Sequence, residues 1–352
     1  MSSPSSWAAT SLFRAHKVMT TSRGYLDAYL GPLAEWLDDP AVSEIAINPD
    51  GQVWIEREGM EYLERVSPPC PVEADRLARQ IAGAAGLKVS EDHPIISART
   101  DWNGAELRAQ AVLPPAIETG AALSFRKYRP DHRTIGDFPF LYGRSVPMGE
   151  RLGRQRAAMT AAIDAGDAEA ALRQAVRDRL NVLISGGTSS AKTTLARTMI
   201  ACMGEKERLI TIEDARELHP RQQNRVELVA DRDPTSPRTT THLLQSALRM
   251  RPDRIVVGEL RGTEAWTYLE AINTGHGGSI TTIHAEHPDM AVERLAMMVT
   301  GARLAMPYAD ITRYVRRSID LIVQLERAGG RRGIVEMTMP AIDSQPGGQD
   351  GA

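Results

Sequence analysis

The sequence has very little cysteine and no long apolar run. Its 352 residues include only Cys70 and Cys202, which are too far apart to form a CxxC metal knuckle or a disulfide framework. We expect both to be buried thiols in a reducing cytoplasm. No apolar stretch approaches the roughly 20 residues that cross a bilayer, and no basic start leads into an apolar block as in a secretory signal. The sequence therefore predicts a cytoplasmic protein.

A strong charge of either sign is also missing. There are 42 basic and 45 acidic side chains, giving a formal net charge of -3. Such a balance does not favour a nucleic-acid binder, so we expect no direct sequence-specific binding to nucleic acid. Apolar residues at 42% and charged residues at 25% are typical of a globular protein, and the length suits two domains.

The composition changes along the chain in a way that predicts domain boundaries. Residues 1–20 and 341–352 are polar, without periodicity, and are expected to be disordered. Residues 21–130 predict a small α+β domain, and residues 131–150 form a linker rich in proline and glycine. Within the first domain we expect helices over 24–37 and 74–87, a hairpin over 44–58, and strands over 105–115 and 122–128.

The second predicted domain, residues 151–340, begins with helical segments over about 150–180. Short apolar strands then alternate with helices; the strands are expected at 182–185, 209–212, 254–259 and 279–284. That alternation predicts an α/β domain with a mainly parallel sheet and helices on both faces.

A glycine-rich stretch follows the first of these strands. In "SGGTSSAKTTL", residues 185–195, an apolar strand runs into a loop of small residues that opens a helix. This order points backbone N–H groups and the helix dipole at one spot, as a phosphate-binding loop does. Lys192 is expected to reach the β- and γ-phosphates of ATP, and the Thr193 hydroxyl to ligate Mg²⁺. The predicted nucleotide-binding residues are Gly186, Gly187, Thr188, Ser189, Ser190, Ala191, Lys192, Thr193 and Thr194.

One position departs from the phosphate-loop pattern, because Ala191 stands where glycine precedes the lysine. The extra methyl is inexpensive if the residue has negative φ and costs on the order of 1 kcal/mol if φ is positive. Neither case removes the lysine or the hydroxyl. We therefore expect weaker nucleotide binding at most, and a loop that has lost its function is the less favoured alternative.

Acidic residues follow two of the other predicted strands. Glu259 comes at the end of "RIVVGE", where a phosphate loop needs a carboxylate near the γ-phosphate or its Mg²⁺. Glu213 and Asp214 end the strand of "LITIED". Adjacent strand residues point to opposite faces, so only one of this pair is expected to face the nucleotide.

Two histidines flank the last predicted strand in "TGHGGSITTIHAEH". His276 and His284 have two possible roles: metal ligands, or neutral side chains that hydrogen-bond a phosphate or bridge to another subunit. The second role is favoured because only His287 could join them as a further histidine ligand.

Taken in order, the phosphate loop, acidic pair, strand glutamate and double-histidine segment resemble the secretion ATPases of type II and type IV systems. The match is greatest to the conjugal-transfer ATPases of the TrbB type, and it extends over about 25–339. The resemblance implies a RecA-like ATPase domain and a hexameric ring at the cytoplasmic face of the inner membrane. The ring would work with inner-membrane components in substrate export or pilus assembly.

The resemblance also implies roles for individual residues. Glu259 would handle the attacking water or the Mg²⁺ shell, Glu213 would be catalytic or linked to Mg²⁺, and His276 and His284 would sense the nucleotide. Arg108 and Arg126 of the first domain would approach the terminal phosphates when that domain closes over the nucleotide. Ser189 and Ala191 stand where the family usually has glycine.

Three alternatives remain open from the sequence. The chain could be a pilus or type II secretion ATPase, although its two cysteines exclude the four-cysteine zinc module of many type II members. It could be a non-hydrolysing ring gated by nucleotide, because of Ala191. It could be a DNA-translocating ATPase, which would need a basic channel.

Overall fold

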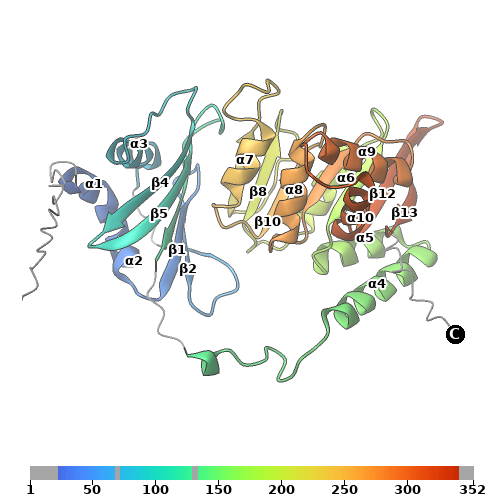
Figure 1. The fold of residues 1–352 in the computed structure, drawn as a ribbon, viewed down its shortest axis with the longest axis horizontal. Coiled ribbons are helices and arrows are strands. Elements are labelled where there is room, and N and C mark those ends of the chain that lie inside the picture. Colours follow the sequence, from blue (N-terminus) through green and yellow to red (C-terminus); the bar gives the residue numbers. More distant parts are fainter. Residues whose placement is uncertain (1–22, 68–71, 129–133, 341–352) are drawn as a thin grey trace, which may run out of the picture.

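The computed structural model describes residues 23–67, 72–128 and 134–340, and the predicted leader, the predicted tail and Cys70 lie outside these ranges. Figure 1 shows two sheets, one in the N-terminal region (23–128) and one in the C-terminal region (134–340). Residues 134–147, within the predicted linker, contain only the 3₁₀ turn η2 (Ile135–Asp137). The helix α4 (Met148–Asp164) then leads back to the C-terminal sheet (Figure 1).

The N-terminal region is a six-stranded antiparallel sheet with helices on one face. The strand order is β3-β2-β1-β6-β5-β4. Leu77 and Ile81 of the amphipathic helix α3 are buried in the same apolar cluster as Phe125 of the sheet. The elements are α1 (Arg23–Leu30), η1 (Gly31–Leu33), α2 (Ala34–Asp38), β1 (Val42–Ile47), β2 (Val53–Arg57), β3 (Glu64–Arg65), α3 (Ala74–Ala84), β4 (Ile95–Trp102), β5 (Ala105–Val112) and β6 (Ala122–Lys127).

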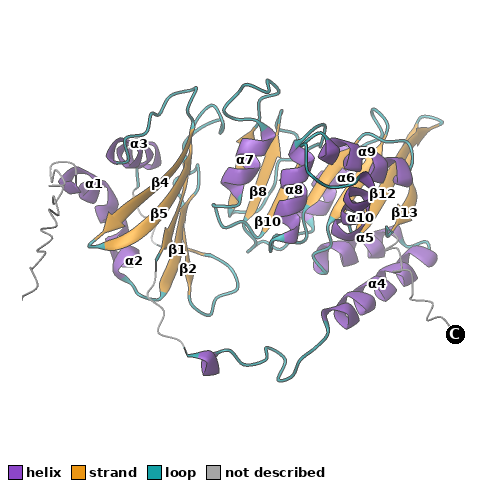
Figure 2. Cartoon of the chain, viewed as in Figure 1, coloured by secondary structure: helices purple, strands orange, loops and turns teal. Residues whose placement is uncertain are grey.

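The C-terminal region is a seven-stranded sheet with helices on both faces (Figure 2). Its order is β13-β12-β7-β11-β10-β8-β9, and all neighbouring strands are parallel except the β12–β13 hairpin. The strands are β7 (Val182–Gly186), β8 (Leu209–Glu213), β9 (Arg225–Val229), β10 (Arg254–Val257), β11 (Ile280–Ile283), β12 (Leu321–Ala328) and β13 (Arg331–Thr338). The remaining helices are α5 (Ala168–Arg177), α6 (Lys192–Ala201), α7 (Thr240–Ala247), α8 (Glu264–Asn273), α9 (Pro288–Thr300) and α10 (Tyr308–Ser318).

The central strands are parallel because each is a short, continuous apolar run joined to the next by a helix. Every residue of β7, β8, β10 and β11 is buried. Parallel strands bring their carboxyl ends to one edge of the sheet, so the residues that follow β7, β8, β10 and β11 share that edge.

The two regions pack together beside β8 and β9, at the end of the C-terminal sheet nearest the N-terminal sheet (Figure 1). Val112 and Ala122 of the N-terminal sheet belong to the same apolar cluster as Ile210 and Val226. The Arg208 guanidinium is fully buried between them and donates to the side-chain oxygens of Asn48 and Asn224, at 2.6 and 2.5 Å.

Candidate active site

The loop of residues 186–191 joins β7 to α6 at the carboxyl edge of the sheet. The side chain of Ser190 donates to the Gly187 carbonyl at 2.9 Å, which closes the loop on itself. Gly186 has φ +157° and lies against the Leu325 carbonyl, where a Cβ would be only 2.5 Å away. Ser189 and Ala191 both have positive φ, at 59° and 78°. The methyl of Ala191 therefore sits in the costlier of the two conformations considered from the sequence.

The ammonium of Lys192 points back into this loop. Its Nζ donates to the Gly186 and Gly187 carbonyls at 2.9 Å each, and it lies 3.2 Å from His284 Nδ1. Burial lowers the pKa of Lys192, with Glu259 opposing that shift. The first helical turn also contains the half-buried Thr193 and the exposed Thr194, beside Lys192.

His284 connects Lys192 to Glu259. Its Nε2 lies 3.1 Å from Glu259 Oε1, and burial lowers the pKa of the imidazole. Because an ammonium can only donate, Nδ1 of the neutral ring accepts from Lys192 and Nε2–H donates to the carboxylate. The three side chains come from α6, from the end of β11 and from the end of β10, and the parallel sheet brings them together.

Glu259 is linked to two arginines, Arg261 directly and Arg232 through Asp214, which no local sequence pattern singles out. Arg261 donates to Glu259 at 2.6 Å and to Asp214 at 2.9 Å, and Asp214 also pairs with Arg232. The four side chains line one cavity of about 480 Å³ at the ends of β8 and β10. The only hint in the sequence is that Arg261 follows Glu259 by two residues.

The two acidic residues at the end of β8 differ in burial, as expected for adjacent residues that point to opposite faces of a strand. Glu213 is buried, and its Oε1 accepts from the backbone N–H groups of Glu217 and Leu218 at 3.0 and 3.1 Å, so it holds the following loop. Its Oε2 has no hydrogen-bond partner among the described residues, and burial raises its pKa to about 7. Asp214 is the exposed member of the pair.

The two predicted histidines are not neighbours. His276 precedes β11 by four residues and donates its Nδ1–H to the Ala271 carbonyl at 3.2 Å, whereas His284 follows β11 directly. They lie at opposite ends of one strand and cannot hold the same ion. The alternative of a shared metal is therefore wrong, and only His284 lies at the phosphate loop.

Arg108 and Arg126 also lie away from the phosphate loop. They are directly opposite each other on β5 and β6, and they line a cavity with Arg179, Asp253 and His276, residues that precede β7, β10 and β11. This is the amino edge of the sheet, and the phosphate loop is at the carboxyl edge. The expected approach of these arginines to phosphates held by the same chain is therefore corrected.

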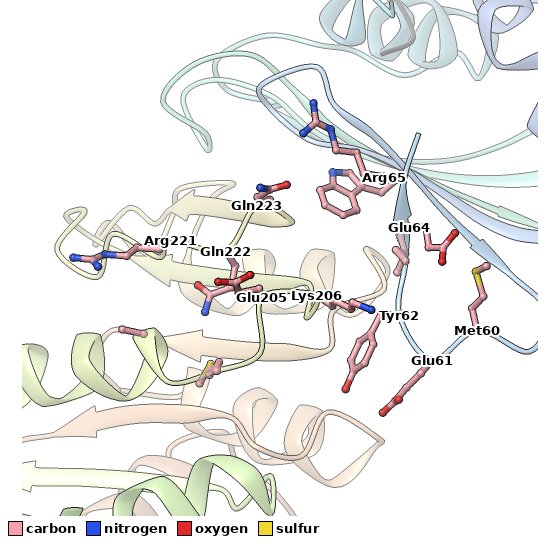
Figure 3. A pocket seen from close by; sticks show the side chains of 14 residues that line it. Met60, Glu61, Tyr62, Glu64, Arg65, Glu205, Lys206, Arg221, Gln222 and Gln223 are labelled. Atoms are coloured by element: carbon pink, nitrogen blue, oxygen red, sulfur yellow. The ribbon is translucent and has the colours of Figure 1, made fainter. Parts of the chain in front are cut away.

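Cys202 is exposed, so the prediction that it is buried is wrong. A cavity of about 840 Å³ lies between the regions and is lined by Tyr62 and Glu61 on one side and by Glu205, Lys206 and Arg221 on the other (Figure 3). It contains none of the predicted nucleotide-binding residues.

Known proteins resemble the chain over most of its length. The family model for type II/IV secretion system proteins matches residues 132–339, more than half of the chain. The chain belongs to the type II/IV secretion system family. The VirB11 protein of Rhizobium radiobacter is 36% identical over 309 residues, which are 84% of this chain and 88% of that protein. The type IV secretion system protein VirB11 of Brucella suis biovar 1 is 35% identical over 84% of both chains.

A solved structure agrees with this family assignment. The VirB11 ATPase from the Brucella suis type IV secretion system, crystallised with sulphate, is 33% identical and superposes with a TM-score of 0.79. The match covers 89% of this chain and 97% of that one. The predicted RecA-like fold is confirmed, and the chain is an ATPase of the type IV secretion class. Within the described residues, no helix has the length and apolar character needed to span a membrane.

Proposed function

We propose that the chain is the motor subunit of a type IV secretion or conjugative-transfer apparatus, with ATP held by residues 186–194. One observation carries the assignment of the site: Lys192, His284 and Glu259 are in contact at the start of a helix that follows a glycine-rich loop. Free backbone amides and a helix N-terminus attract phosphate, and a lysine and a carboxylate stand on either side of the place where it would lie.

Nucleotide would replace the internal contacts of this site. Lys192 would exchange two backbone carbonyls for the β- and γ-phosphates, which leaves His284 bound only to Glu259. His284 can then donate to a phosphate oxygen or orient Glu259 toward water. Glu213 would act indirectly, by fixing the loop that contains Asp214, and His276 would act at the other edge of the sheet.

The residues at this edge fit Mg²⁺ as a partner of the nucleotide. Thr193 supplies a hydroxyl and Glu259 a carboxylate, which are the oxygen donors that Mg²⁺ prefers beside phosphate oxygens and water. The described residues contain no group of three metal-binding side chains, so the ion would arrive with the nucleotide. Mg²⁺ would neutralise charge on the phosphates, and Glu259 would hold its water shell or the attacking water.

The positions of Arg108 and Arg126 favour a ring of chains. Both guanidiniums are mostly exposed, at 67% and 73% of the side chain, and lie at the edge of the sheet away from their own phosphate loop. In a head-to-tail ring, the amino edge of one chain can face the carboxyl edge of its neighbour. We therefore assign the two arginines to the nucleotide of the adjoining chain, and a hexamer is the closed ring that the family resemblance implies.

The linker predicted over residues 131–150 would allow the two regions of a chain to move during the ATPase cycle. ATP bound between two chains would hold the N-terminal region of one against the C-terminal region of the other, through contacts with the γ-phosphate. Hydrolysis would remove those contacts and allow the regions to separate. Inner-membrane components of the apparatus would receive this movement at the cytoplasmic face of the membrane.

The test is ATP hydrolysis measured together with solution mass. Lys192→Ala should reduce turnover at least a hundredfold, since a P-loop without its lysine loses the charge that binds the β- and γ-phosphates. Lys206→Ala, at an exposed lysine in the other cavity, should hydrolyse ATP normally. The proposed motor function would be refuted if the wild-type protein formed rings but released no phosphate. Full turnover by the Lys192→Ala variant would also refute it.

A further inference from the structure

A cavity of about 490 Å³ lies between the two regions at the amino edge of the C-terminal sheet. Arginines from both regions line it: Arg108 and Arg126 from the N-terminal sheet, and Arg179, Arg249 and Arg251 from the C-terminal region. Such a concentration of guanidiniums is costly unless anions balance it. The first question is which of them already have anionic partners in the chain.

Arg179 and Arg251 already form ion pairs and hydrogen bonds within the chain. Arg251 forms ion pairs with Glu56 and with Asp253, and it donates to the Glu61 carbonyl, so it fastens the N-terminal region to the C-terminal one. Arg179 donates to the Asp253 carbonyl and lies 3.5 Å from Glu207. These two arginines have structural partners and are not free for a ligand.

The other three arginines are exposed and poorly paired. Arg108 and Arg126 lie 3.8 and 3.6 Å from Glu106 and Glu44, distances too long for a hydrogen bond. Arg249 is exposed, and across residues 23–67, 72–128 and 134–340 its side chain has neither a hydrogen bond nor an ion pair. Arg108 and Arg126 therefore have only long ion pairs, Arg249 has none within the described residues, and all three face one cavity with donors that an anion could accept from.

The carboxyls of this cavity do not balance the charge. Burial raises the pKa of Glu44 to about 8, so that it is mostly uncharged at neutral pH. Asp253 is occupied by the backbone N–H of Arg208 and by Arg251. The space is therefore positive, and planar guanidiniums match the oxygens of a phosphate.

The position of Arg249 indicates which chain's nucleotide could reach it. Arg249 lies between α7 and β10, in the same sheet domain as the phosphate loop but at the amino end of the strands. No hinge movement of the N-terminal region can carry it to the other edge of its own sheet. A nucleotide phosphate that contacts Arg249 would therefore have to come from outside the chain, at the cavity that Arg108 and Arg126 also line.

We propose that Arg249 contacts the terminal phosphate of the nucleotide bound by a neighbouring chain, as a third arginine beside Arg108 and Arg126; this rests on the proposed function. The site then takes residues from both regions of one chain and the phosphate loop of the next. Movement of either region would change the contacts of the γ-phosphate.

Single substitutions provide the first test. In the full-length chain, Arg249→Ala should lower ATP turnover tenfold or more while the ring mass and the ATP affinity change less than about twofold, because the P-loop of each chain is intact. Arg249→Lys should restore part of the rate, since the charge returns without the planar fork. Arg221→Ala, at an exposed arginine in the other cavity, should hydrolyse ATP as the wild type does. Full turnover by Arg249→Ala would overturn the proposal.

Mixed rings provide the second test. Lys192→Ala and Arg249→Ala chains with different affinity tags are co-expressed and purified over both tags. About a quarter of the sites then combine an intact loop with an intact Arg249 from the neighbour, if chains mix at random in a closed ring. Turnover should recover to about that fraction of wild type, from two nearly inactive parents. No recovery would mean that Arg249 serves its own chain, and would overturn the proposal.

Two outcomes separate this inference from the proposed function. In the first outcome, the wild type hydrolyses ATP, and mixed rings of Lys192→Ala and Arg126→Ala chains recover turnover. If mixed rings of Lys192→Ala and Arg249→Ala chains do not recover turnover, only the inference about Arg249 fails. Binding of free ATP or inorganic phosphate to the cavity is the other possible source of the anion. Calorimetry tests this source with the Lys192→Ala variant, whose own phosphate loop lacks its lysine. If that variant binds ATP or phosphate and the Lys192→Ala/Arg249→Ala variant does not, the cavity binds a free anion. The proposal that Arg249 contacts the neighbour's nucleotide would then be refuted.

Discussion

The backbone at Ala191 is left-handed, with φ 78° and ψ 27°, directly before the lysine of the phosphate loop. A Cβ in this conformation costs on the order of 1 kcal/mol, which glycine avoids. The chain nevertheless closes the loop, since Ser190 and Lys192 bond to the carbonyls of Gly186 and Gly187. The extra methyl therefore adds local strain and leaves the arrangement of the site intact.

Ala191→Gly should stabilise the protein by up to about 1 kcal/mol, because relief of the left-handed strain exceeds the entropy that glycine adds to the unfolded chain. Ala201→Gly, in the last turn of α6, has ordinary helical geometry and should lose about 0.5–1 kcal/mol. Denaturant midpoints measure both changes, and equal losses in the two variants would contradict the argument.

Glu44 makes stability depend on pH. Burial raises its pKa from 4.5 to about 8, partly opposed by Arg126, while Glu56 raises it further and Arg251 and Arg208 lower it. Between these pH values the folded protein holds a proton that the unfolded chain releases. The free energy of unfolding should therefore fall as pH rises from 4.5 to about 8.

Glu44→Gln removes this titration, so the variant should lose less stability than the wild type between pH 5 and pH 8. Urea midpoints at the two pH values give the comparison directly. Glu64→Gln, at an exposed glutamate of β3, is the control and should keep the wild-type difference. A Glu44→Gln variant whose midpoint changes with pH as much as that of wild type would show that Glu44 is ionised when folded.

At the scale of elements, the turn between β1 and β2 fastens the N-terminal region to the C-terminal sheet. Asn48 lies in this turn and accepts from Arg208, whose guanidinium is fully buried beside β8. Asn48→Ala would leave that guanidinium short of an acceptor, which costs about 1–3 kcal/mol. Asp50→Ala, in the same turn but exposed, should cost far less. Thermal or urea unfolding measures both, and equal stability of Asn48→Ala and wild type would exclude this role.

The elements differ in how well the sequence predicts them. The sequence predicts β7, β8, β10 and β11 because each is a continuous apolar run between helical segments. It does not single out β9, whose buried positions alternate with Arg225 and Glu227 at the edge of the sheet. The β12–β13 hairpin was also missed, although its Gly329–Gly330 turn, with both φ positive, is a recognisable signal.

The residues of the site also differ in how well the sequence predicts them. The spacing of the phosphate loop predicts Lys192, and the ends of apolar strands predict Glu259 and His284, because parallel strands fix that edge of the sheet. The pairing of Arg261 with Asp214 depends on the strand order, which no local pattern contains. The position of Arg108 and Arg126 depends on how the two regions pack, so the sequence places them on a sheet but not beside a particular nucleotide.

At the scale of the whole molecule, the connection between the two regions exposes an unusual amount of apolar surface. Four large side chains within seven residues are about two-thirds exposed or more: Ile135, Phe138, Phe140 and Leu141, at 93%, 67%, 66% and 86%. Figure 1 shows this segment crossing below the two sheets, apart from both ribbons, on its way to α4. Apolar groups gathered in this way mark an interaction surface, and in a ring of identical chains the adjoining chain is the partner at hand.

The proposed ring therefore makes a specific prediction for this segment, residues 135–142. The double variant Phe140→Ser/Leu141→Ser should weaken association, because burying two such side chains is worth about 3–6 kcal/mol per contact. Sedimentation at several protein concentrations should show lower mass than wild type, while circular dichroism stays the same. Arg144→Ser, at an exposed charged position in the same connection, should assemble normally. If the double variant forms rings at the wild-type concentration, the segment does not contact the adjoining chain, and the ring must be held by the two sheets alone.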